Sequence, residues 1–109
     1  MMYKIFTTVN FKKEYKRLLK KYPSLKDEIT ELGYELSSNP IQGKHLGNNV
    51  YKIRLKIKSK GKGKRGGARV ITKVKIVDEM VYLFSIYSKG EKDDISDNEI
   101  SDLLKDIPQ

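Results

Sequence analysis

Cysteine and tryptophan are absent from the 109 residues, proline occurs three times and histidine once. Without cysteine the chain can form neither a disulfide framework nor a thiolate metal site. No apolar run approaches the roughly 20 residues that a membrane-spanning helix needs. The start MMYKIFTTVNFKKEY lacks the apolar stretch and the small-residue cleavage site of a signal peptide. We therefore expect a soluble, cytoplasmic protein with no membrane partner and one domain over residues 1–109.

The motifs of several enzyme classes are also missing. The single histidine, His45, has no carboxylate at metal-ligand spacing, so we expect no metal site and no cofactor. The stretch GKGKRGG at 61–67 is not a P-loop, because the GxxxxGK[ST] spacing fails and no helix follows. No nucleophilic triad is visible. Any chemistry therefore depends on Lys, Arg and Tyr side chains.

Negative charge is missing from the middle of the chain. Residues 52–77 contain eleven Lys or Arg and no acid, whereas residues 78–109 contain three Lys and nine Asp or Glu. A net charge of +9 is compatible with a solubilising surface. The complete absence of acids over the basic stretch nevertheless favours a polyanionic partner, such as a nucleic acid.

Hydrophobic periodicity predicts an α+β domain of order β-α-α-β-β-β-α, with a helical hairpin on one face of a mainly antiparallel four-stranded sheet. Strands are expected over 3–8, 50–58, 68–77 and 80–87, and helices over 11–22, from Ser24 and from Ser96. We expect Asn10 to cap the first helix. Capping boxes, formed by Ser24 with Asp27 and by the SDNE motif at Ser96, are expected for the other two.

Strand alternation predicts which side chains share a face of the sheet. The helical hairpin is expected to cover the face that carries Ile53, Leu55, Val70, Phe84 and Ile86. The opposite face then carries Lys52, Arg54, Lys56, Arg69, Lys73 and Lys75, with Tyr87 and Lys89 at the end of the last strand. Lys and Arg side chains are common on a solvent-exposed face of a sheet. Like charges on neighbouring strands are destabilising, however, which favours an anionic ligand here.

A site made of Lys, Arg and Tyr is sufficient to cleave RNA. The nucleophile is the RNA's own 2′-hydroxyl, so the protein only positions it, supplies positive charge to the phosphorane and moves protons. Crowding by cations is expected to lower the pKa of a lysine or tyrosine, which would let either side chain transfer protons near neutral pH. For Tyr87, packing at the end of a core strand is the competing interpretation.

Four stretches, in their order and spacing, resemble the RelE superfamily of bacterial toxins, in particular the HigB/RelE-like branch of type II toxin–antitoxin systems. They are YKIRL (51–55), GKRGGARVI (63–71), LFSIYSKGEKDDIS (83–96) and NEISDLL (98–104). The resemblance covers nearly the whole chain. It implies a RelE-like fold and a toxin that enters the ribosomal A site, cuts mRNA without a metal and inhibits translation. A cognate antitoxin, expected to be of the helix-turn-helix type, would neutralise it.

The resemblance also implies catalytic residues. Lys52 and Arg54 align with the family's paired basic positions, Arg69 with its phosphate-stabilising arginine, and Lys89 falls near a further basic position. Where RelE-type members place a C-terminal catalytic tyrosine, this chain has a serine at position 96. Tyr87 is expected to take over that role, which leaves the general base open.

Mobile lysines around the glycine-rich stretch are expected to hold ribosomal RNA rather than perform chemistry. The predicted RNA-binding residues are Lys56, Lys58, Lys60, Lys62, Lys64, Arg65, Lys73, Lys75 and Lys92. Two other functions stay open. A ParE-like toxin would poison DNA gyrase with the same fold, although such relatives generally lack the converged basic cluster. A non-catalytic nucleic-acid-binding module would share the charge but not the cleavage.

Overall fold

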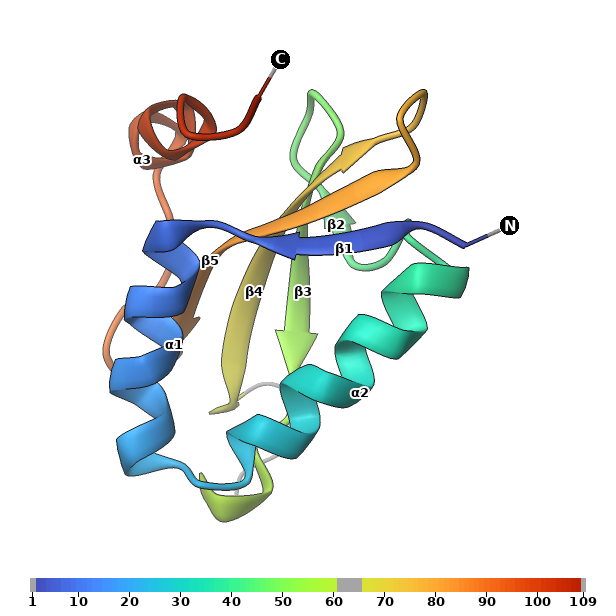
Figure 1. The fold of residues 1–109 in the computed structure, drawn as a ribbon. Coiled ribbons are helices and arrows are strands. Elements are labelled where there is room, and N and C mark those ends of the chain that lie inside the picture. Colours follow the sequence, from blue (N-terminus) through green and yellow to red (C-terminus); the bar gives the residue numbers. More distant parts are fainter. Residues whose placement is uncertain (1, 61–65, 109) are drawn as a thin grey trace.

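A computed structural model describes residues 2–60 and 66–108 (Figure 1). The elements, in order, are β1 (Lys4–Thr7), α1 (Val9–Lys21), α2 (Leu25–Ser38), β2 (Lys44–His45), β3 (Val50–Leu55), a 3-10 turn (Lys58–Lys60), β4 (Ala68–Lys75), β5 (Met80–Ser88) and α3 (Asp97–Leu104). The predicted α+β class is confirmed, with one additional short strand. None of the helices in the described part of the chain is long and apolar enough to cross a membrane.

The sheet has five strands in the order β1-β5-β4-β3-β2, where a four-stranded sheet was predicted. β1 runs parallel to β5, and the other neighbours are antiparallel. The additional strand, β2, pairs Lys44 with Lys52 and His45 with Tyr51. Two residues are too few to show an alternating pattern, which is why sequence periodicity missed it. Gly43 permits this close approach, since a Cβ there would lie 2.2 Å from the carbonyl oxygen of Lys52.

α1 and α2 cover one face of the sheet, as predicted, and the main core lies between the two layers (Figure 1). The buried side chains of the helices are Phe11, Leu18, Leu25, Leu32 and Leu36, and those of the strands include Ile53, Val70, Val74, Val81, Leu83 and Ile86. These helices present one apolar stripe each, so burial against the sheet, rather than helix propensity, is the main source of their stability.

The predicted Asn10 cap and the predicted Ser24–Asp27 capping box are wrong, whereas Ser24 does stand at the N-cap position of α2. Thr8, not Asn10, caps α1, because its hydroxyl accepts from Phe11 N at 3.1 Å. Ser24 precedes α2 but makes no capping bond, since its hydroxyl contacts Glu28 and accepts from Ser59 N at 2.9 Å. The capping box at the start of α3 is confirmed, with the Ser96 hydroxyl accepting from the Glu99 backbone N–H.

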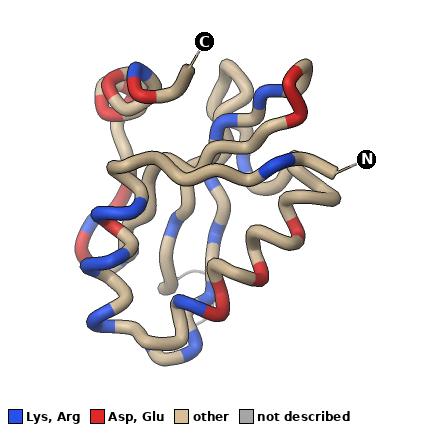
Figure 2. Tube along the Cα trace, viewed as in Figure 1, with Lys and Arg blue, Asp and Glu red and all other residues tan. Residues whose placement is uncertain are grey.

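The second face of the sheet is only partly exposed to solvent, because α3 packs against it. A second buried cluster joins Val50, Ile71, Phe84, Tyr87, Ile95 and Ile107 to the partly buried side chains of α3. Phe84 therefore lies on this face, and its predicted place under the helical hairpin is wrong. Acidic residues concentrate on α2 and α3, whereas α1, β3 and β4 carry basic ones (Figure 2).

A β-bulge in β5 explains the position of Phe84. Ile71 pairs with Ser85 and Thr72 pairs with Leu83, so Phe84 is an extra residue without a partner in β4. Such a residue shifts the alternation of the strand by one. Without it, Tyr87 would share the face of Leu83 beneath the helices. With it, Tyr87 points to the opposite face, where the basic residues lie.

Two side chains of α1 stabilise the bulge. Asn10 Nδ2 donates to the carbonyl oxygen of Phe84 at 3.0 Å. Glu14 Oε1 accepts from Ser85 Oγ at 2.9 Å and from Ile86 N at 3.3 Å, and it also accepts from Asn10 Nδ2 at 2.8 Å. Polar backbone groups that a bulge leaves out of the ladder are costly when they are buried without a partner. Helix α1 supplies these partners and thereby fixes the direction of the end of β5.

Replacing Glu14 with Ala should destabilise the protein, because it removes the acceptor of Ser85 Oγ and Ile86 N. A lost acceptor of this kind costs about 1–3 kcal/mol in the free energy of unfolding, which urea titration would measure. Glu14→Gln keeps an acceptor oxygen and should lose less. An unfolding midpoint of Glu14→Ala equal to that of wild type would show that the bulge does not depend on Glu14.

Candidate active site

The ends of three neighbouring strands bring four of the predicted catalytic residues to one face. Arg54 of β3 pairs with Arg69 of β4, which in turn pairs with Tyr87 of β5. Lys52 lies two residues before Arg54 on the same face of β3. Neighbouring strands are about 4.8 Å apart, so these side chains start from adjacent positions on the sheet. We call Lys52, Arg54, Arg69 and Tyr87 the cationic row.

The two arginines of the cationic row differ in burial. Arg69 is 5% exposed, and its Nη1 donates to the carbonyl oxygen of Ala68 at 3.2 Å. Arg54, directly opposite, is exposed. Like charges on opposing strand positions repel each other. An anion bound between them would relieve this repulsion, and a planar guanidinium can hold a phosphate through two parallel bonds.

Asp94, a residue that sequence reasoning missed, joins the cationic row from the segment between β5 and α3. Its Oδ1 accepts from Lys52 Nζ at 3.1 Å, from Tyr87 Oη at 3.3 Å and from Ile95 N at 2.9 Å. The Ile95 amide, followed by the Lys52 side chain, lowers the pKa of the Asp94 carboxyl below its ordinary value. Asp94 is therefore an ionised partner of both Lys52 and Tyr87 at neutral pH.

The pKa of Tyr87 changes in the opposite direction to the prediction. Burial, followed by the negative charge and hydrogen bond of Asp94, raises it to about 12, and the opposing effect of Arg69 is smaller. The expectation that surrounding cations lower this pKa is therefore wrong. The phenol is 2% exposed and is protonated at neutral pH. It can donate a proton or a hydrogen bond, but it does not serve as a phenolate base.

Lys89 and Lys92 lie just beyond the cationic row. Lys89 Nζ donates to the carbonyl oxygen of Asp93 at 2.6 Å, and Lys89 N donates to Gly67 O at 3.0 Å. A Cβ at Gly67 would lie 2.1 Å from Leu55 O, so only glycine fits at this position, just before β4 begins between β3 and β5. Lys92, which is predicted to bind RNA, has its Nζ 5.4 Å from the centre of the Tyr87 ring and forms an ion pair with Glu99.

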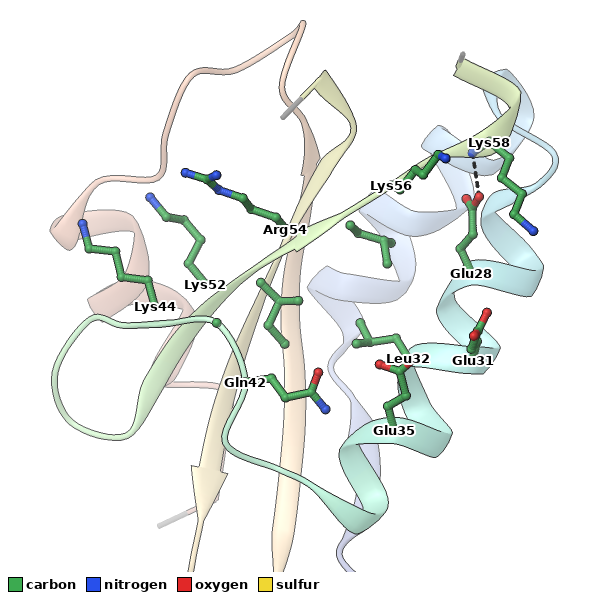
Figure 3. Close-up of a pocket in the computed structure, with 13 residues that line it drawn as sticks. Glu28, Glu31, Leu32, Glu35, Gln42, Lys44, Lys52, Arg54, Lys56 and Lys58 are labelled. Atoms are coloured by element: carbon green, nitrogen blue, oxygen red, sulfur yellow. Dashed lines mark hydrogen bonds between the residues drawn. The ribbon is translucent and has the colours of Figure 1, made fainter. Parts of the chain in front are cut away.

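The described part of the basic loop is anchored to α2 and to the end of β5. Lys58 N donates to Glu28 Oε2 at 2.6 Å. Lys60 Nζ donates to Ser88 Oγ at 2.8 Å and lies 5.6 Å from the centre of the Tyr22 ring. The side chains of Lys56 and Lys58 are exposed, and both lie near Glu28 of α2 (Figure 3). The predicted RNA-binding residues Lys62, Lys64 and Arg65 lie outside the described residues.

Lys73 and Lys75 lie on the predicted face but at the far end of β4. At about 3.3 Å per residue, Lys73 is about 13 Å along the strand from Arg69. Lys73 Nζ donates to Asn48 O, and Lys75 Nζ donates to Pro108 O at 2.7 Å. Burial, followed by the charge of Lys75, lowers the pKa of Lys73. The structure does not bring these two lysines to the cationic row.

A groove of about 700 Å³ runs between α2 and β3, beside the cationic row (Figure 3). One wall carries glutamates of α2, and the other carries basic residues of β2 and β3. Lys44, Lys52 and Arg54 extend side by side away from α2 (Figure 3). Lys44 is a second residue that sequence reasoning missed, since only its pairing with Lys52 places it beside the site.

A family model described as the RelE toxin of the RelE/RelB toxin–antitoxin system matches residues 3–107. The chain belongs to the RelE toxin family. The resemblance to the RelE family that was inferred from the sequence is thereby confirmed.

Two solved structures share the fold of this RelE-family toxin. A mutant of the E. coli toxin RelE in the free state is 20% identical, with a TM-score of 0.65 over 99% of this chain and 100% of that chain. The toxin–antitoxin complex RelBE2 from Mycobacterium tuberculosis is 14% identical, with a TM-score of 0.59 over 81% of this chain and 99% of that chain. At these identities the likeness establishes the fold.

The raised pKa of Tyr87 predicts a loss of stability at alkaline pH. An unfolded tyrosine has a pKa of about 10, whereas the folded value is about 12. The stability that Tyr87 contributes through its proton is therefore complete below about pH 10 and is lost as the pH rises toward 12. Chemical unfolding between pH 9 and 12 should show a steeper loss for wild type than for Tyr87→Phe. Parallel curves would contradict the raised pKa.

Proposed function

We propose that this RelE-family toxin is a ribosome-dependent mRNA endoribonuclease that inhibits translation. The observation that carries the proposal is the cationic row, in which Lys52, Arg54 and Arg69 converge beside a protonated Tyr87. No group of three or more His, Asp or Glu that could hold a metal ion occurs among the described residues. The proposed reaction needs none, because RNA supplies its own nucleophile.

In the proposed reaction, the 2′-hydroxyl of one nucleotide gives its proton to solvent water and attacks the adjacent phosphorus, and the bond to the 5′-oxygen breaks. The products are a 2′,3′-cyclic phosphate and a 5′-hydroxyl. Arg54 and Arg69 hold the phosphate and stabilise the charge that develops on the phosphorane. Tyr87, a neutral phenol, donates its proton or a hydrogen bond to the leaving 5′-oxygen. Lys52, whose ammonium contacts the same Asp94 oxygen as Tyr87, adds further positive charge.

The proposed partners are the ribosome with its bound mRNA and a cognate antitoxin. Lys56 and Lys58 are exposed and follow Arg54 along the chain, which suits contact with ribosomal RNA phosphates. The Mycobacterium tuberculosis relative was solved in complex with its antitoxin. An antitoxin that covers the basic face of the present chain would block access of RNA to it.

Replacing Lys52, Arg54 or Arg69 with Ala should each slow single-turnover cleavage of mRNA on programmed ribosomes. The loss of one contact to the transition state costs on the order of 10²–10³ in rate. Lys26→Ala removes an exposed lysine of α2 and serves as a control with the wild-type rate. Because Arg54 is exposed, Arg54→Ala should also keep the wild-type unfolding midpoint. Wild-type rates in all three site variants would refute the proposed function.

Replacing both Lys56 and Lys58 with Gln should weaken ribosome binding without slowing cleavage at saturating ribosome. Each phosphate contact on single-stranded RNA contributes about 0.7 to the log–log dependence of affinity on salt, so the slope should flatten by about 1.4. Binding titrations at several salt concentrations measure this slope. Unchanged affinity together with slow cleavage would instead place these lysines in the chemical step.

A further inference from the structure

We propose that Asp94 is a positioning residue of the cleavage reaction, which joins Tyr87 and Lys52 into one unit and fixes both against the substrate phosphate. This inference rests on the proposed function. It adds a carboxylate to a site that was otherwise inferred from basic residues and a phenol. Asp94 acts through Tyr87 and Lys52, and it is not itself assigned contact with the RNA.

The carboxylate of Asp94 links two strands that are not neighbours. Lys52 is on β3 and Tyr87 is on β5, with β4 between them, so their backbones are roughly 10 Å apart. One oxygen of Asp94 nevertheless accepts from both, at 3.1 Å and 3.3 Å. A residue above the sheet is needed to tie these two side chains together, and Asp94 has this position.

The segment that carries Asp94 is anchored at several points. Before it, Glu91 accepts from Arg17 Nη1 at 2.7 Å and from Lys21 Nζ at 3.0 Å. After it, Ile95 is 7% exposed in the second buried cluster, and its N–H donates to Asp94 Oδ1. The side chain of Asp94 is 64% exposed, and an isolated ion pair at such a place contributes little. The anchored backbone lowers the entropy cost of holding this geometry.

The hydrogen bond to Asp94 determines how Tyr87 is oriented. In the free protein the single O–H of the phenol points at Asp94, so the carboxylate holds the phenol oxygen in place. When the substrate is bound, this proton turns from Asp94 to the leaving 5′-oxygen. The cation of Lys92 above the ring restrains it further. Lys52 uses one of its three N–H groups for Asp94 and keeps two for other acceptors. Lys52, Arg54 and Arg69 together still exceed the single charge of Asp94, so a phosphate remains attracted.

The test uses Asp94→Ala and Asp94→Asn, with Asp93→Asn as the matched control. Asp93→Asn changes the net charge by the same amount one residue away and keeps the backbone carbonyl that Lys89 uses. Three quantities are measured in the full chain: single-turnover cleavage at saturating programmed ribosomes, ribosome affinity, and the titration of Tyr87 by NMR of 13C-labelled tyrosine. The last readout would not respond to a merely structural role of residue 94.

We expect Asp94→Ala to slow cleavage on the order of 10- to 100-fold, the range known for outer partners that orient metal ligands. Ribosome affinity should not fall, since a negative charge is removed. The pKa of Tyr87 should decrease in both Asp94 variants, because the charge of the carboxylate is lost. Asp94→Asn keeps an acceptor oxygen and should lie between Ala and wild type in rate. Asp93→Asn should match wild type in all three measurements.

Several results would overturn the inference. Wild-type cleavage by both Asp94 variants would show that Asp94 does not position the reaction, while the proposed function would stand. Faster cleavage and tighter ribosome binding would make Asp94 an inhibitory counter-ion rather than a positioning residue. An unchanged Tyr87 pKa would refute the contact itself. Failure of wild type to cleave would instead refute the proposed function. If the Ala variant does not fold, the isosteric Asn variant decides between these outcomes.

Discussion

The bulge at Phe84 determines the direction of the last side chains of β5, and the candidate site depends on it. One extra residue moves Ile86 beneath the helices and Tyr87 to the opposite face, beside Arg69. Asn10 and Glu14 of α1 bind the polar groups that the bulge removes from the ladder. A helix on one side of the sheet thus fixes a functional side chain on the other, which is a common use of bulges near active sites.

The site has three basic side chains and one carboxylate, Asp94, so it keeps a net positive charge. Arg54 and Arg69 oppose each other across two strands, where like charges are unfavourable. Asp94 supplies a counter-charge to Lys52 and also accepts from Tyr87, and its single charge is smaller than that of the three basic residues together. The same carboxylate, together with burial, keeps Tyr87 protonated. The site therefore combines cations for a phosphate with a neutral proton donor, which suits phosphoryl transfer without a metal.

Local patterns in the sequence were sufficient to predict most elements and the face of the site. Alternation in VYKIRL placed Lys52 and Arg54 together, and the SDNE motif marked the start of α3. Apart from the cap of α1, the errors involve contacts between distant segments. Phe84 was misplaced because a bulge has no local signal, and β2 was missed because it has two residues. The Tyr87 pKa was wrong in direction because its burial, the larger cause, and the contact with Asp94 both arise only in the folded protein.

RNA cleavage by its own 2′-hydroxyl, directed by the cationic row, is tested most directly by changing the substrate rather than the protein. Ribosomes would be programmed with mRNA that carries either ribose or 2′-deoxyribose at the position of cleavage, and single-turnover cleavage by wild type would be followed. The proposed mechanism predicts that the ribose substrate is cut to a cyclic phosphate and a 5′-hydroxyl, whereas the deoxy substrate stays intact. Cleavage of both substrates at the same rate would contradict it.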